Sequence, residues 1–267
     1  MPPTRPATTG RGHPPTRDPR PTVLVGCGGL TLALTSADAA WLDQARSRFA
    51  TFPGDGAPTL TIVHGGNAGE PAGGRQVFSR ATAGFDAWLD ADAHLAALPA
   101  EAGIGELENL LRFLLPRLLG DSLAFHAAVL TDGTRGFLCV GECGAGKTTL
   151  AGLLPEQALC DEIGVARREA GGFAVHSTPY WTGRSGHAPL AAVMLLRHGP
   201  AHQARRIAPA TATGRLAHHL LWPSDDPTAM ARAFGLLAEL TATVPVFDLA
   251  FRPTADVWGT IVAAGAA

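Results

Sequence analysis

Apolar residues along this chain fall into short runs that alternate between strand-like and helix-like spacing. The runs Thr22–Cys27 and Leu30–Ser36 meet at Gly28-Gly29, which predicts a β-hairpin. A cap at Ser36 or Asp38 predicts a helix to about residue 49. Further short strands are expected over Leu60–His64, 76–79 and 85–89. These patterns predict a small α+β region over residues 22–100.

A leucine stripe predicts a buried helix over residues 105–119. The leucines recur every three or four positions, so they share one helical face: Leu107, Leu110, Leu111, Leu114, Leu115 and Leu118. Pro116 is expected to kink the last turn of this helix.

Strand-like and helix-like runs alternate from Leu123 to the carboxyl terminus. Strands are expected over 125–131, 136–141, 159–168, 173–177, 191–197 and Val246–Phe251, and helices over 147–154, 211–221, 228–243 and the last residues. This alternation predicts an α/β fold for a larger domain over residues 101–267. Residues 1–21 are rich in proline and arginine and are expected to form a disordered tail.

Composition narrows the classes of partner. The 267 residues carry a formal charge of −2, and the arginines are scattered, so no nucleic-acid surface is expected. No apolar run approaches the ~20 residues of a membrane span. The four cysteines show neither disulfide nor metal spacing, which favours reduced thiols and a cytoplasmic location. Composition leaves homo-oligomer formation open.

The strongest chemical motif surrounds the only lysine of the chain, Lys147. Glycine, four residues and Gly-Lys-Thr form a P-loop pattern, and the expected strand and helix flank it on either side. A compact ammonium reaches phosphate oxygens as a point charge, whereas a guanidinium is wider. The predicted nucleotide-binding residues are Gly141, Glu142, Cys143, Gly144, Ala145, Gly146, Lys147, Thr148 and Thr149. Thr148 is also expected to hold Mg²⁺.

Acidic and histidine residues on neighbouring strands are candidates for catalysis. Asp161-Glu162 follows an apolar run soon after the P-loop, so either carboxylate is a candidate general base and either a Mg²⁺ ligand. A surface acidic pair at a turn is the alternative. His126 begins the strand before the P-loop strand, where a structural role is the alternative to a catalytic one.

Several nucleotide-binding classes are excluded. The guanine motif Asn-Lys-x-Asp needs a second lysine, which the chain lacks. The Leu-Ser-Gly-Gly-Gln sequence of transporters and the glycine loop of protein kinases are also missing.

Three motifs in order carry a family resemblance: Phe125-His126-Ala127, the P-loop at 141–149, and Cys160-Asp161-Glu162. Over residues 123–181 the chain resembles HPr kinase/phosphorylase-like proteins, which share a fold with phosphoenolpyruvate carboxykinase. It looks most like shorter relatives such as lasso-peptide kinases. The resemblance implies a P-loop-containing mixed sheet, transfer of phosphate from ATP to a serine or threonine hydroxyl, and active-site roles for His126, Asp161 and Glu162. The pair is Asp-Glu instead of Asp-Asp, and the phosphorylase motif is missing, so the reverse reaction and HPr as substrate are not expected.

Three hypotheses for function follow. The first is a Mg²⁺·ATP kinase that acts on a Ser/Thr hydroxyl of a peptide or protein, with Lys147 as a catalytic cation. The second is a small-molecule kinase on the same fold. The third is a non-catalytic, ATP-binding regulatory module.

Overall fold

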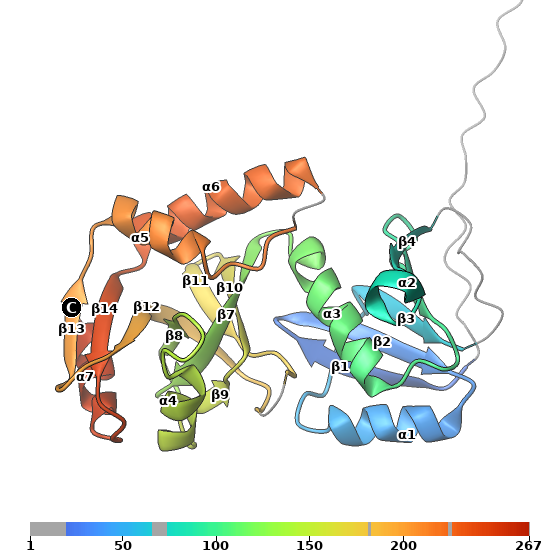
Figure 1. Ribbon diagram of the computed structural model, residues 1–267, viewed down its shortest axis with the longest axis horizontal. Helices are drawn as coiled ribbons and strands as arrows, with labels where there is room; N and C mark the ends of the chain where they lie inside the picture. The colour runs from blue at the N-terminus through green and yellow to red at the C-terminus, as the bar shows by residue number, and fades with distance from the viewer. Residues whose placement is uncertain (1–19, 66–73, 181–182, 224–225, 267) are drawn as a thin grey trace, which may run out of the picture.

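The computed structural model describes residues 20–65, 74–180, 183–223 and 226–266 (Figure 1). Over these residues the chain forms a mixed α/β protein with a six-stranded and an eight-stranded sheet and seven helices. The predicted α/β class is confirmed at this level. Most of the predicted tail, residues 1–19, lies outside the described residues.

The first lobe is a six-stranded mixed sheet in the order β1-β2-β3-β6-β5-β4. Its strands are β1 Thr22–Cys27, β2 Leu30–Ser36, β3 Leu60–His64, β4 Arg75–Phe78, β5 Ala87–Asp90 and β6 Leu95–Leu98. The β1–β2 hairpin turns at Gly28 and Gly29, both at positive φ, as the sequence predicts. Helix α1, Ala39–Arg48, is capped by the Asp38 side chain, and the short helix α2 spans Arg80–Ala83.

Helix α3, Ile104–Leu118, lies between the two lobes (Figure 1). Its leucine stripe is buried in one cluster with the first sheet, and the same cluster includes Ile163, Val165 and Tyr180 of the second lobe. Backbone hydrogen bonds also join the lobes, such as the 3.0 Å bond from the Gly28 N–H to the Ser177 carbonyl. The lobes therefore share a continuous apolar core.

The second lobe is an eight-stranded sheet in the order β11-β10-β7-β8-β12-β14-β13, with β9 paired to β7. The strands are β7 Ser122–Thr131, β8 Gly136–Val140, β9 Ala158–Cys160, β10 Ile163–Glu169, β11 Gly172–His176, β12 His187–His198, β13 Gln203–Arg206 and β14 Val246–Phe251. Because β11 pairs with both β10 and β12, five of these strands close into a ring. Strands β8, β12 and β14 run parallel, so their carboxyl ends meet at one edge.

Four helices flank the second sheet. They are α4 Lys147–Leu153, α5 Pro209–Ala217, α6 Pro227–Thr243 and α7 Val257–Ala264. Residues of α5 and α6 pack in one apolar cluster of this sheet, and residues of α4 and α7 pack in another. None of the helices in the described ranges is long and apolar enough to cross a membrane.

Two elements differ from the sequence prediction in ways that shape the site. The strand expected over 159–168 is broken at Asp161-Glu162 into β9 and β10, because the two pieces pair with separate parts of β7. The helix expected over 211–221 ends at Ala217. The following residues instead bond to β7, through His126 N–H to the His219 carbonyl and Leu221 N–H to the Ala124 carbonyl. The sequence prediction also missed strands β6 and β13.

Candidate functional site

The glycine-rich loop leaves the carboxyl end of β8 and enters α4. Gly144 and Gly146 have φ values of 81° and 100°, a conformation that side-chain-bearing residues rarely adopt. A Cβ on Gly146 would lie 2.7 Å from Cζ of Phe251, and one on Gly141 would lie 2.7 Å from Cβ of Ala145. Glycine is therefore required by backbone conformation at Gly144, by close packing at Gly141 and by both at Gly146.

The amide groups of this loop are arranged to receive an anion. The Ala145 N–H is bonded to the Glu142 carbonyl at 3.0 Å, and the His198 ring bonds to the Gly144 carbonyl at 2.7 Å. Within the described part of the chain, the N–H groups of Cys143, Gly144 and Gly146 donate to no protein group. Successive unbonded amides in a glycine loop suit phosphate oxygens. The residues present thus fit the polyphosphate of a nucleotide.

Lys147 closes the loop from within. Its side chain is buried, and Nζ donates to the carbonyls of Gly141 at 2.7 Å and Glu142 at 3.1 Å. Burial lowers the pKa of Lys147, while the nearby negative charge of Glu162 opposes that shift. The two carbonyls therefore hold the ammonium against the first residues of the loop.

His126 and Glu162 meet beside the start of the loop because of strand register. Ala127 pairs with Val140, the last residue of β8, so His126 lies one step from Gly141. On the other edge of β7, His126 pairs with Ile163, and the Ala127 N–H bonds to the Glu162 carbonyl. The imidazole Nε2 lies 3.2 Å from the Glu162 Oε2.

Arg112 of α3 completes this ion-pair network from the first lobe. Its Nη2 donates to Oε1 of Glu162 at 2.7 Å, so each carboxylate oxygen has a different partner. Burial tends to raise the pKa of Glu162, but the Arg112 hydrogen bond and the His126 charge outweigh burial and lower it below its usual value. Glu162 is therefore anionic at neutral pH.

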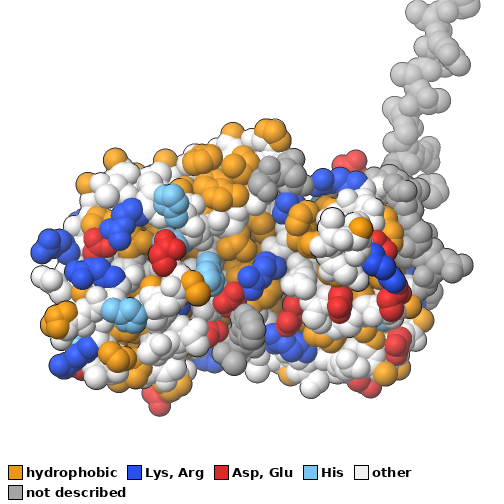
Figure 2. Space-filling model, viewed as in Figure 1, with side chains coloured by type: hydrophobic (Ala, Val, Ile, Leu, Met, Phe, Trp, Pro, Cys, Tyr) orange, Lys and Arg blue, Asp and Glu red, His pale blue; other side chains and the backbone are white. Residues whose placement is uncertain are grey.

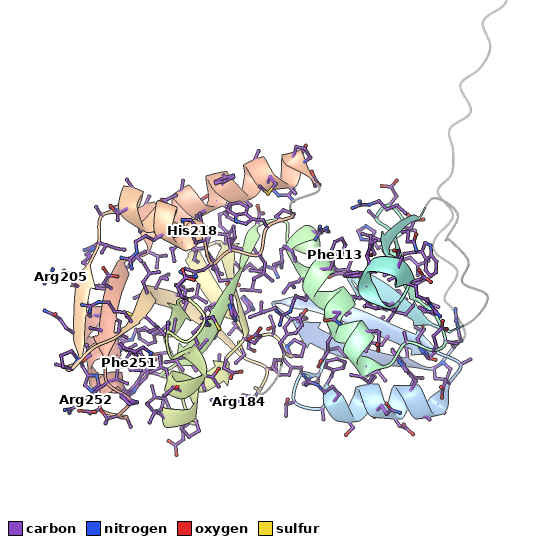
Figure 3. The ribbon with its side chains drawn as sticks, viewed as in Figure 1. Phe113, Arg184, Arg205, His218, Phe251 and Arg252 are labelled. Atoms are coloured by element: carbon purple, nitrogen blue, oxygen red, sulfur yellow. The ribbon has the colours of Figure 1, made fainter. Side chains whose placement is uncertain are left out.

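A cavity of about 420 Å³ joins these groups. It is lined by loop residues Gly141, Glu142 and Cys143, by Arg112, His126 and Ile163, and by the run from His218 to Leu221. Figure 2 shows histidine, acidic and basic side chains next to one another where the two lobes meet. Figure 3 shows His218 just below α5 in the second lobe. Phe251 and Arg252 lie at the lower left of the same lobe. The cavity opens where β8 ends and the 219–221 segment continues along β7.

The predicted site residues are only partly brought together. His126 and Glu162 form a pair, His126 lines the cavity with Glu142 and Cys143, and Lys147 bonds to the carbonyls of Gly141 and Glu142. Thr148 and Thr149 are exposed at the start of α4, and Asp161 is buried between β9 and β10. In the described ranges, no group of three or more His, Cys, Asp and Glu side chains is placed to hold a metal ion. The expected Mg²⁺ roles of Thr148, Asp161 and Glu162 stay predictions.

Sequence reasoning missed three charged or titratable residues that line the cavity: Arg112, His218 and His219. Arg112 lies among the leucines of α3, next to Leu111, and a charge there is a weak signal for a site. The histidine pair was assigned to a helix, and only its bonding to β7 brings it to the cavity. The pKa of His219 is lowered by burial, against the opposing charge of Glu142.

The four cysteines are free thiols. Cys27, Cys139 and Cys160 are buried, and burial raises the pKa of each to about 12, whereas Cys143 is exposed in the loop. The three buried thiols are therefore unreactive at neutral pH.

No protein-family model matches this sequence, and no curated protein matches it.

Proposed function

We propose that this protein is a Mg²⁺·ATP-dependent kinase that transfers the γ-phosphate to a Ser/Thr hydroxyl of a peptide or protein. One observation carries the proposal: a glycine loop with a buried lysine opens on the same cavity as a histidine–carboxylate pair. A phosphate cradle alone supports binding, and a positioned proton acceptor beside it supports transfer.

The histidine–carboxylate pair supplies the base. The Glu162 carboxylate accepts from Nε2 of His126, which leaves Nδ1 of the neutral ring as the proton acceptor. In the transfer, the acceptor oxygen forms a bond to the γ-phosphorus, the bond to the bridging oxygen of ADP breaks, and the hydroxyl proton passes to His126. Lys147 and the loop amides stabilise the charge on the phosphate oxygens.

A divalent cation fits as a partner of the nucleotide. Mg²⁺ binds phosphate oxygens and one or two protein oxygens and keeps several waters, so it needs no cluster of protein ligands. When bound, it would neutralise charge on the β- and γ-phosphates. Thr148, at the start of α4, and Asp161 are the residues proposed to hold it; Glu162 has one oxygen bonded to Arg112 and the other to the His126 ring.

A small-molecule acceptor is the second candidate, and the size of the cavity favours it. About 420 Å³ lies within the roughly 300–1,000 Å³ range of small-ligand sites. The apolar side chains of Leu220, Leu221 and Ile163 suit an acceptor with an apolar part.

Transfer from γ-labelled ATP tests the proposal. The purified protein is incubated with Mg²⁺, labelled ATP and two libraries, one of Ser/Thr peptides and one of hydroxylated metabolites, with Lys147→Ala as the inactive control. We expect label on peptide hydroxyls. Label on metabolites alone would replace the peptide acceptor, and ATP binding without any transfer would favour the regulatory module.

A further inference from the structure

Arg112 is a first-lobe side chain placed at the second lobe's site. Its helix, α3, is fixed by leucines in the shared core, including Leu110 and Leu111, both at most 2% exposed. Arg112 itself lies on the outer side of the helix, and its side chain is 45% exposed. The packing of the first lobe therefore sets where this guanidinium stands.

Two second-lobe residues fix the direction of the guanidinium. Glu162 accepts one hydrogen bond from it, and its Cζ lies 5.7 Å from the centre of the Tyr180 ring. Tyr180 is only 3% exposed, so the ring is a rigid support, and an arginine over an aromatic face is stabilised by the charge on that face. The side chain is thus held in place without bound substrate.

Arg112 also lines the cavity. Its single hydrogen bond to a described residue uses one of several N–H donors, and Arg112 lines the same space as Gly141, Glu142 and Cys143. Lys147 bonds to the carbonyls of Gly141 and Glu142, which line this cavity together with Arg112. A planar fork of donors matches the oxygens of a phosphoryl group.

We propose that Arg112 contacts the phosphoryl group during its transfer, so that the first lobe supplies a cation to the site. This inference rests on the proposed function. Arg112 would approach the transferring group from α3 and Lys147 from the glycine loop, and Arg112 would neutralise charge that develops on the oxygens of that group. The first lobe then contributes a side chain to the chemistry, in addition to sharing an apolar core with the second lobe.

Binding of a transition-state mimic tests this contact without any need for an acceptor. The affinities of ADP·Mg²⁺ alone and of ADP·Mg²⁺ with aluminium fluoride are measured by calorimetry for wild type, Arg112→Ala and Arg112→Lys. Arg168→Ala is the matched control, because Arg168 is also about half exposed and paired with two carboxylates, Asp121 and Glu239, outside the cavity.

We expect the wild type to bind the fluoride complex more tightly than ADP. In Arg112→Ala, the ratio of the affinity for the fluoride complex to that for ADP should fall at least about tenfold, while the ADP affinity itself changes by less than about twofold. Arg168→Ala should match wild type in both affinities. Arg112→Lys should lose part of the gain, because an ammonium lacks the planar fork. Circular dichroism of each variant confirms folding before the comparison.

The outcomes separate this inference from the proposed function. If Arg112→Ala keeps the full gain with aluminium fluoride, or if wild type shows no gain at all, the contact with the phosphoryl group is wrong. A loss confined to Arg112 variants, in a protein that labels no acceptor, would support the contact and overturn the kinase proposal.

Discussion

The two lobes use the ends of their strands in opposite ways. In the first lobe, β2, β3 and β6 run parallel, and His64 at the end of β3 is buried, stacked on Trp41 at 4.1 Å and bonded to Ser36. In the second lobe, β8 ends in a loop whose neighbouring polar groups line an open cavity. Parallel strand ends thus provide a place for a site, and the residues there decide whether it is filled by packing or left open to a ligand.

Glu162 bonds to Arg112 and His126 where the lobes meet, and its substitution is expected to have the largest kinetic effect. Glu162→Gln keeps the shape of the side chain but removes the charge that orients His126. We expect kcat for phosphate transfer to fall by up to roughly 10²–10⁴-fold, the usual contribution of a general base, because His126 would lose the carboxylate that orients it.

Steady-state transfer assays check this effect, with Glu239→Gln as the control. Glu239 pairs with Arg168 away from the cavity, so its loss should leave kcat unchanged. Equal rates for Glu162→Gln and wild type would remove the histidine–carboxylate pair from the chemistry.

The shared core predicts that damage to the first lobe affects the whole molecule. Leu110 is fully buried, so Leu110→Ala should lower the free energy of unfolding by about 2–5 kcal/mol. Leu24 in the same lobe is 39% exposed and serves as the matched control. Leu24→Ala should change the free energy of unfolding by no more than about 0.5 kcal/mol. Denaturant unfolding, followed by two probes, measures the free energy of unfolding of both variants. If the second lobe unfolded separately and unchanged in Leu110→Ala, the lobes would be independent.

The loop of the second lobe should tolerate no side chain at its last glycine. Gly146→Ala places a Cβ at φ 100° and 2.7 Å from Phe251, so we expect a loss of about 1–3 kcal/mol in unfolding free energy. Gly152→Ala is the control within α4. The new Cβ meets nothing within 4 Å, so this substitution should raise the free energy of unfolding by roughly 0.5–1 kcal/mol. Thermal melts of the two variants should therefore shift in opposite directions.

The smallest expected effect is the pH dependence of the contact between the lobes. The pKa of Glu162 is lowered below its usual 4.5, so its ionised form favours the folded state above that pH. This stabilisation is lost as pH falls through the lower, folded-state pKa. Because Arg112 is about half exposed, we expect no more than about 1 kcal/mol.

Unfolding free energies of wild type and Glu162→Gln, measured across pH, check this dependence. Their difference should be constant above about pH 5 and should shrink in more acidic solution. A difference that grows with acidity would mean that the carboxylate is not stabilised by its cationic partners.

Local sequence patterns predicted most of the strands, the leucine helix and the glycine loop, because these depend on nearby residues. The register that brings His126 to the loop follows from the turn between β7 and β8 and was within reach of the sequence. The bonding of Arg112 to Glu162 and of His126 to His219 was not, because both contacts depend on packing between segments far apart in the chain. The break at Asp161-Glu162 was also hidden, since an apolar run continues on both sides of it.

Calorimetric titration of ATP·Mg²⁺ into wild type and Lys147→Ala tests the central claim most directly. Lys147 is the only lysine of the chain, and its ammonium is buried and bonded to the first carbonyl of the glycine loop. We predict that wild type binds ATP and that Lys147→Ala, folded as judged by circular dichroism, binds at least about tenfold more weakly. Equal affinity in the two proteins would contradict nucleotide binding by this loop, and with it the proposed phosphate transfer.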